Sequence, residues 1–182
     1  MLVNSDAFCR LSLENVLIFT APRLHATLTA EFIFVYARLM LTNGLTLNDS
    51  MEIILSSMSH AEFFHNSGII HIYPKHTMLF LPAGLPAIAH HSIHAIEYLF
   101  AHDEFCPWGT RPALICPQCS SKNSWSKPTR EGSTITLSCK ASGKGKECTK
   151  KCSFEKPDGM RSLGVDIGGG KWMALELKWY MG

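Results

Sequence analysis

Hydrophobic residues in the first third of the chain recur every three or four positions, the spacing of an amphipathic α-helix. Three such runs occupy residues 11–19, 24–41 and 51–66, and residues 48–50 (Asn-Asp-Ser) offer an N-cap for the third. The apolar face of the second run comprises Leu28, Phe32, Val35 and Leu39. The pattern therefore predicts an N-terminal helical region.

The pattern changes in the next segment. GIIHIYP and HTMLFLP are short runs of β-branched and aromatic residues that flank a Pro-Lys pair, which predicts a β-hairpin. Residues 87–102 then return to helical spacing, with Pro86 suited to the first turn of a helix. The stripe that predicts this helix comprises Ile88, Ile93, Ile96, Leu99 and Phe100.

Two later runs favour strands. STITLSC alternates apolar and polar residues, and KKCSFEKP follows it after the loop SGKGKE. The chain therefore predicts an α+β fold, with N-terminal helices and a β-hairpin followed by a small β module. We expect a helical or α+β domain at 1–110, the β module at 111–160, and a C-terminal strand or tail at 161–182. The run WMALELKWY would form an edge strand in that last segment.

Charge is distributed unevenly along the chain. Residues 1–115 carry five Lys or Arg against nine Asp or Glu, whereas residues 116–160 carry nine against four. The basic residues are thus concentrated in the predicted β module. This asymmetry indicates an acidic partner, of which nucleic acid is the commonest.

The N-terminus has no basic stretch before its apolar residues, as a secretory signal would. The most apolar run, residues 32–41, is too short to cross a bilayer and contains Arg38. We therefore expect an intracellular protein of the nucleus or cytoplasm, without a membrane partner. In a reducing compartment, clustered cysteines are more often metal ligands than disulfides, and an odd total of seven favours the same interpretation.

Five of the seven cysteines lie between residues 116 and 152. Cys116-Pro-Gln-Cys119 is a CxxC motif in which a tight turn can direct two thiolates at one ion, and Cys139 follows after nineteen residues. This spacing resembles that of the zinc ribbons, in which four cysteines hold a tetrahedral Zn²⁺ between β-hairpins. The β module is accordingly expected to be zinc-ribbon-like, with Zn²⁺ as its cofactor.

The fourth ligand has two candidates. Cys148 precedes the second strand, as the last ligand of a ribbon should, and closes the shorter loop. Cys152 lies inside that strand and remains the alternative. The position relative to the strand favours Cys148.

Two other motifs suggest chemistry. His90 and His94 are four residues apart, and on a helix they could chelate a second metal, but a polar helix face is the favoured interpretation. The run LGVDIGGGK resembles the phosphate-binding turn of sugar kinases in the actin-like ATPase superfamily. Only eleven residues follow Lys171, so we expect a glycine turn rather than a nucleotide site. No catalytic residue is assigned, and the chain favours a non-enzymatic protein.

A second resemblance rests on the run HTMLFLPAGLPAIAHHSIHAIEYLF, on FCPWG, and on CPQC followed by a tryptophan. Over residues 28–175 the chain resembles a group of uncharacterised fungal proteins found as scattered gene copies. In that group a small helical region precedes a ribbon-like cysteine module. The resemblance implies ancestry in a mobile element and no known activity.

The function expected from these features is weakly selective binding of DNA or RNA by the ribbon. The residues expected to contact nucleic acid are Lys122, Trp125, Lys127, Arg130, Lys140, Lys144, Lys146, Lys150 and Lys151. In the alternative, the ribbon is only a structural staple and the helical region docks a protein partner.

Overall fold

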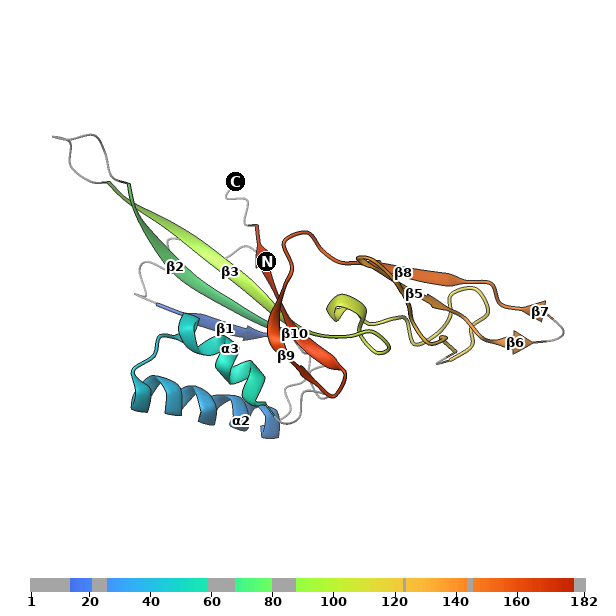
Figure 1. Cartoon of the computed structure of the whole chain (residues 1–182), viewed down its shortest axis with the longest axis horizontal. Helices are drawn as coiled ribbons and strands as arrows, with labels where there is room; N and C mark the ends of the chain where they lie inside the picture. Colours follow the sequence, from blue (N-terminus) through green and yellow to red (C-terminus); the bar gives the residue numbers. More distant parts are fainter. Residues whose placement is uncertain are drawn as a thin grey trace.

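The computed structural model describes residues 14–20, 26–58, 68–79, 88–122, 124–143 and 146–178. Within these ranges the chain is mostly β, so the predicted α+β fold with N-terminal helices is wrong. Its strands form a five-stranded antiparallel sheet in the order β1-β2-β3-β10-β9, a three-stranded sheet in the order β4-β5-β8, and the two-stranded ladder β6-β7. Figure 1 shows the five-stranded sheet and the smaller sheets at opposite ends of an elongated molecule.

The strands are β1 Val16–Phe19, β2 Ile69–Leu79, β3 Ile88–His102, β4 Thr129–Glu131, β5 Thr134–Ser138, β6 Ser142–Gly143, β7 Lys146–Glu147, β8 Lys151–Glu155, β9 Arg161–Ile167 and β10 Gly170–Leu177. The helices are α2 Ala26–Ala37 and α3 Leu47–Ser57, with a π-helical turn η1 Arg38–Thr42 after α2 and a 3₁₀ turn η3 Pro107–Gly109. None of the helices in the described ranges is long and apolar enough to span a bilayer.

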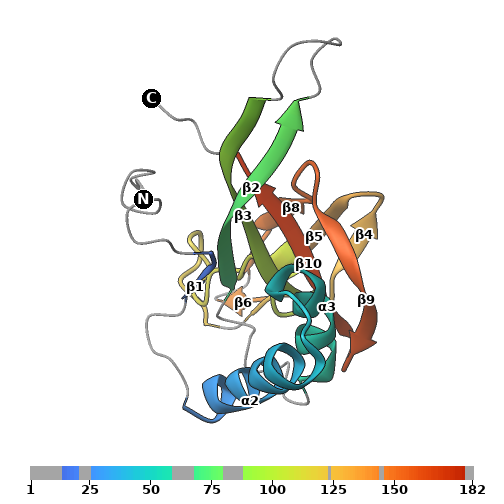
Figure 2. The ribbon, with the colours of Figure 1, turned by 90° about the vertical axis from the view of Figure 1, so that its left-hand side faces the viewer.

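Helices α2 and α3 cover one face of the five-stranded sheet (Figure 2). Two of the predicted helical runs thus contain helices, although residues 59–66, the end of the third run, lie outside the described residues. The N-cap of α3 is Thr46, two residues earlier than predicted, and its hydroxyl accepts a hydrogen bond from the backbone N–H of Asp49. The side chains of Met51, Ile54 and Leu55 point into the core between helix and sheet.

The predicted helix at 87–102 is strand β3, which pairs with β2 on one side and β10 on the other. Tyr98 and Phe100 are buried against the helices. Leu99 and Ala101 pack toward residues 111–160, the predicted β module, which is called the cysteine module from here on. Because both faces of the strand are buried in its C-terminal half, from Ala95 to Ala101, apolar residues occur there at odd and even positions. An unbroken apolar run contains residues at helical spacing by chance. Alternation of apolar and polar residues indicates a strand only when one face of the strand meets solvent.

The predicted helix at 11–19 is also wrong where it is described, because Val16–Phe19 forms strand β1 and pairs with β2. The predicted hairpin at 68–82 is wrong where it is described, because the single strand β2 runs through Pro74 without a turn. Residues 80–82 lie outside the described residues. Strand β1 pairs only as far as Ile72, so among the described residues β2 has one neighbouring strand at Pro74. A proline, which lacks the N–H donor, is tolerated at such an edge.

Strand β10 was expected at the edge of a sheet, but it lies between β3 and β9. The glycine-rich motif before it makes the β9–β10 hairpin, in which Ile167 pairs with Gly170. Gly168 and Gly169 both have positive φ angles, 59° and 83°, as a two-residue type I′ turn requires. The kinase-like motif is therefore a hairpin turn, and the segment set apart as residues 161–182 contributes two strands to the main sheet.

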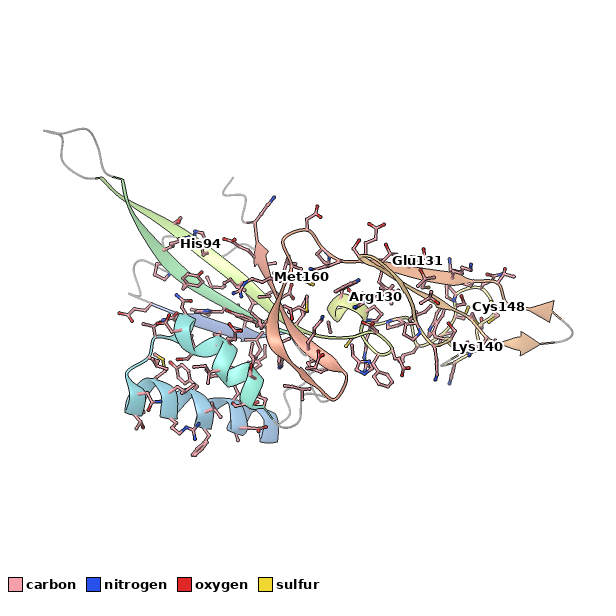
Figure 3. The ribbon with its side chains drawn as sticks, in the orientation of Figure 1. His94, Arg130, Glu131, Lys140, Cys148 and Met160 are labelled. Atoms are coloured by element: carbon pink, nitrogen blue, oxygen red, sulfur yellow. The ribbon has the colours of Figure 1, made fainter. Side chains whose placement is uncertain are left out.

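The cysteine module packs against the sheet face opposite the helices. Ile135 of β5 and Met160 join Trp108, Ala101 and Met173 in one buried cluster. Polar contacts also join the module to the segment that follows β3. Arg130 donates a hydrogen bond of 2.6 Å to Asp103, and its guanidinium carbon lies 4.8 Å from the centre of the Trp108 ring. Figure 3 shows Arg130 and Met160 at this junction, with Cys148 at the far end of the module.

Candidate metal centre

Four cysteines come from two loops at the end of the module. Cys116 and Cys119 lie in one tight turn, closed by a hydrogen bond from the backbone N–H of Ser120 to the carbonyl of Cys116. Ser120 has a φ of 58°, which lets the chain reverse direction there. Cys139 directly follows β5 and Cys148 directly follows β7, so the β6–β7 ladder closes the loop that joins them.

The four sulfur atoms all lie within 4.8 Å of one another. The Cys116 and Cys148 sulfurs are 3.8 Å apart, and those of Cys119 and Cys139 are 3.6 Å apart. In a tetrahedral site with metal–sulfur bonds of about 2.3 Å, the sulfur–sulfur edge is about 3.8 Å. A disulfide bond would bring two sulfurs to about 2 Å. The arrangement therefore suits a metal ion and does not contain a disulfide.

Two thiols of the cluster, those of Cys119 and Cys148, have pKa values shifted in opposite directions. Hydrogen bonds from the side chain and backbone of Ser121 lower the pKa of Cys119 to about 6. A backbone hydrogen bond from Lys150 acts in the same direction on Cys148, but loss of solvation and the three neighbouring sulfurs outweigh it and raise the pKa of Cys148 to about 12. Four thiols packed this closely resist full deprotonation unless a cation compensates their charge.

Hydroxyl groups also contact the cluster, and sequence reasoning missed them. The Ser124 hydroxyl lies 3.1 Å from the Cys139 sulfur, and Ser121 supplies the hydrogen bonds to Cys119 described above. Hydrogen bonds of this kind, made to the ligand atoms of a metal site, orient thiolate ligands and tune their basicity. The serine-rich stretch after the CxxC motif was the signal that could have identified them.

The other cysteines lie elsewhere. Cys152 sits on β8 opposite Leu137 and is absent from the four-sulfur cluster, whereas Cys148, the favoured candidate, belongs to it. Cys106 is buried after the turn that follows β3, and its thiol donates to the carbonyl of Phe100 at 3.1 Å. Burial raises the pKa of Cys106 to about 11, which makes this thiol a poor nucleophile. Cys9 lies outside the described residues.

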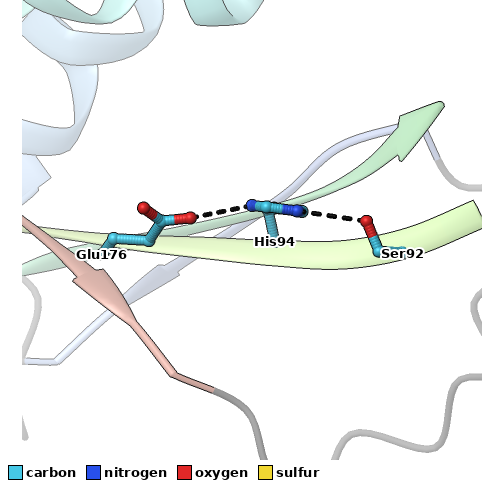
Figure 4. Close-up of polar contacts among 3 residues, drawn as sticks. All are labelled: Ser92, His94 and Glu176. Carbon is cyan, nitrogen blue, oxygen red and sulfur yellow. Dashed lines mark hydrogen bonds and ion pairs between the residues drawn. The ribbon is translucent and has the colours of Figure 1, made fainter. Parts of the chain in front are cut away.

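The histidine pair does not have the helical geometry that chelation at this spacing needs. His90 and His94 lie on strand β3, where positions four apart are about 13 Å from each other along the strand. The side chain of His90 is outside the described part of the structure. His94 instead bonds to the hydroxyl of Ser92 at 3.1 Å and to the carboxylate of Glu176 at 2.9 Å, which links β3 to β10 (Figure 4).

The basic residues of the module differ in their surroundings. Among the expected contact residues, the exposed lysines in the described ranges are Lys122, Lys127, Lys140 and Lys151. Lys150 is half-buried, and Arg130 is engaged by Asp103 and the Trp108 ring. Trp125 is half-buried, and its indole N–H donates to the carbonyl of Ala113 at 2.7 Å. Lys144 and the side chain of Lys146 lie outside the described residues.

The fold and the site together define a β protein with a four-cysteine cluster able to hold a metal ion. No protein-family model matches the chain, and searches of curated proteins and of solved structures give no match. The resemblance to fungal proteins thus has no support from these comparisons.

Proposed function

We propose that Cys116, Cys119, Cys139 and Cys148 hold one structural Zn²⁺ and that the ion folds the cysteine module. The observation that carries this proposal is the set of four sulfurs within 4.8 Å, at separations close to a tetrahedral edge. All four ligands come from the protein, so no coordination position is left for a reacting water. This donor set belongs to structural rather than catalytic zinc.

Purified, reduced protein should contain one zinc per chain. Elemental analysis by mass spectrometry measures the ratio of zinc to protein, and a thiol titration before and after chelation counts the protected cysteines. Four thiols should become reactive when the ion is removed. Iron in place of zinc would contradict the assignment of the ion, and a metal content near zero would contradict the site.

We further propose that the metal-folded module binds single-stranded nucleic acid with little sequence preference. The excess of basic residues in the module supports this role, as do the exposed side chains of Lys122, Lys127, Lys140 and Lys151. Cations that face solvent can neutralise phosphates without first breaking an ion pair. Arg130 cannot do so, because it would have to leave Asp103.

Binding to a single-stranded oligonucleotide should weaken steeply as salt is added. Each phosphate that the protein neutralises contributes about −0.7 to the slope of log K against log salt concentration. Three or four contacts therefore predict a slope near −2 to −3, which is measurable by fluorescence anisotropy. Absence of binding at low salt by zinc-loaded protein would contradict this role and leave the metal site unaffected.

A second role is supported by the apolar side chains exposed on the helices in the described part of the chain. Ile33 and Phe34 on α2 are 54% and 68% exposed, and Leu41 after it is 86% exposed. A protein partner that covered these side chains would bind mainly through apolar contact, so its affinity would change little with salt. The salt titration therefore separates the two roles.

A further inference from the structure

We propose that a cleft between the main sheet and the cysteine module is the site that binds one unstacked base of a single-stranded nucleic acid. This inference rests on the proposed nucleic-acid function and names the site that would perform it. The cleft has a volume of about 430 Å³, within the range of sites that hold small ligands. Its lining includes Glu104, Phe105, Arg111, Leu114, Trp125 and Lys127.

The cleft combines an aromatic wall with cations. Trp125 and Phe105 both line it, and Phe105 is 53% exposed. Arg111 and Lys127 are also exposed lining residues, against one carboxylate, that of Glu104. An aromatic ring offers a stacking surface to any base, and flanking cations can hold the phosphates on either side. This pairing fits a nucleotide within a strand better than it fits an apolar peptide.

The indole of Trp125 is held in place before any ligand binds. Its N–H donates to the Ala113 carbonyl, and its backbone forms a β-bridge with Cys139. The next residue, Ser126, forms two hydrogen bonds with Ser138 of β5. Its backbone N–H donates to the Ser138 carbonyl at 2.7 Å, and its side-chain hydroxyl accepts from the Ser138 N–H at 3.0 Å. A rigid stacking surface loses little conformational entropy on binding.

The metal ligands hold two walls of the cleft. Leu114 lies two residues before Cys116, and Trp125 is bridged to Cys139. The third wall, Glu104 and Phe105, comes from the turn after β3 of the main sheet. The cleft therefore needs the folded module, and removing the ion should weaken ligand binding even though the ion does not touch the ligand.

The accessible face of the base decides which nucleic acid fits. In a duplex the faces of the bases are covered by their stacked neighbours, so they cannot stack on Trp125. We therefore expect preference for a single strand over a duplex of the same sequence. Phosphate contacts alone would give no such preference, because a duplex carries the higher charge density.

The test uses the zinc-loaded full chain and a fluorescein-labelled mixed-sequence DNA strand of about 12 nucleotides. Trp125→Leu should weaken binding roughly 5- to 150-fold, because one lost base–aromatic stack is worth about 1–3 kcal/mol. Trp125→Phe should retain most of the affinity, since both variants lose the hydrogen bond to Ala113 but only phenylalanine keeps a stacking ring. Zinc content and thermal unfolding of both variants check that the module remains folded.

Charge variants complete the experiment. Lys127→Gln should reduce the magnitude of the salt slope by about 0.7 for one lost phosphate contact. Lys151→Gln removes an exposed lysine of the same module that does not line the cleft, and should change affinity less. Equal losses from the two lysine variants, or unchanged binding by Trp125→Leu, would overturn the cleft while leaving general nucleic-acid binding intact.

Two further outcomes bear on the choice of ligand. Equal affinity for the duplex would overturn base insertion, and so would competition by a glutamate-rich peptide as effective as competition by the strand. Absence of binding to any nucleic acid by zinc-loaded protein would overturn this inference together with the nucleic-acid function. Weaker binding after chelation, restored by added zinc, would support the link between ion and cleft.

Discussion

Cys139→Ser should release the metal and unfold the cysteine module, the largest effect expected from a single substitution in this chain. The buried side chains of the three-stranded sheet are few: Ile135 and Leu137 lie on β5, and both are fully buried. A core of this size cannot offset the conformational entropy of about 50 ordered residues. In zinc-finger peptides the ion supplies about 10–16 kcal/mol of apparent binding free energy, which is also folding free energy.

The five-stranded sheet should survive this substitution. Its main core lies between the helices and the sheet face that points away from the cysteine module. This core contains Phe32, Ile54, Tyr98 and Trp172. Limited proteolysis should therefore cut within residues 111–160 first, while far-UV circular dichroism keeps the helical contribution. Loss of all structure in Cys139→Ser would instead show that the cluster around Trp108 couples both parts into one folding unit.

Two matched variants decide the ligand set. Cys148→Ser should also lose the ion, because its sulfur lies in the cluster, 3.8 Å from that of Cys116. Cys152→Ser should retain one zinc per chain and normal resistance to proteolysis, because Cys152 lies on β8 outside the cluster. The reverse pattern of zinc contents would overturn the assignment of the fourth ligand.

The sequence predicted the cysteine cluster better than it predicted the fold around it. A CxxC turn is a local feature, and the alternation in STITLSC matches β5, which has only one face covered. Ligand spacing therefore specifies most of this geometry without tertiary information. The pairing that brings Cys139 and Cys148 close together is equally short in range, since it depends on a small ladder between them.

The main sheet was predicted poorly because part of one strand is buried on both faces and another strand contains a proline. At the end of β3, Phe100 faces the helices and Ala101 faces the module, so no polar face marks this part of the strand. Pro74 lies within β2 where a turn would be expected. The position of β10 in the middle of the sheet follows from pairings with β3, about 75 residues away, which no local pattern encodes.

The cleft could not be predicted because its walls come from three separate segments. Trp125 and Lys127 were candidates from their type and position, but Phe105 and Arg111 were not. The turn after β3 meets the module only once the fold is formed. A tryptophan in a basic stretch is a weak signal alone, and the structure adds the second aromatic ring and the second cation.

The second large effect concerns a buried histidine of the main sheet. The His71 side chain on β2 has no exposed surface, and its Nε2 lies 2.8 Å from the amide oxygen of Asn15. Within the described residues its Nδ1 has no hydrogen-bond partner, and the Tyr73 ring lies 4.8 Å away. Nε2–H therefore donates to Asn15, and a second proton on Nδ1 would be buried without an acceptor. Burial lowers the pKa of His71 to about 4.

This histidine should make the protein less stable as pH falls from about 6.5 to about 4. In that window the unfolded chain binds a proton at His71 and the folded chain does not, so the free energy of unfolding decreases with falling pH. A shift from 6.5 to about 4 corresponds to a loss on the order of 3 kcal/mol across the window. Above about pH 6.5 both states are neutral at this site and the contribution is constant.

His71→Gln should remove this dependence, because glutamine can still donate to Asn15 and does not titrate. Urea unfolding of the two proteins between about pH 4 and pH 7.5 gives their difference in free energy at each pH. The wild-type curve should fall by up to about 1.4 kcal/mol per pH unit relative to the variant. Proton-driven loss of metal affects both proteins alike and cancels in this difference. Parallel curves across the whole range would show that His71 takes up its proton in the folded protein as readily as in the unfolded chain.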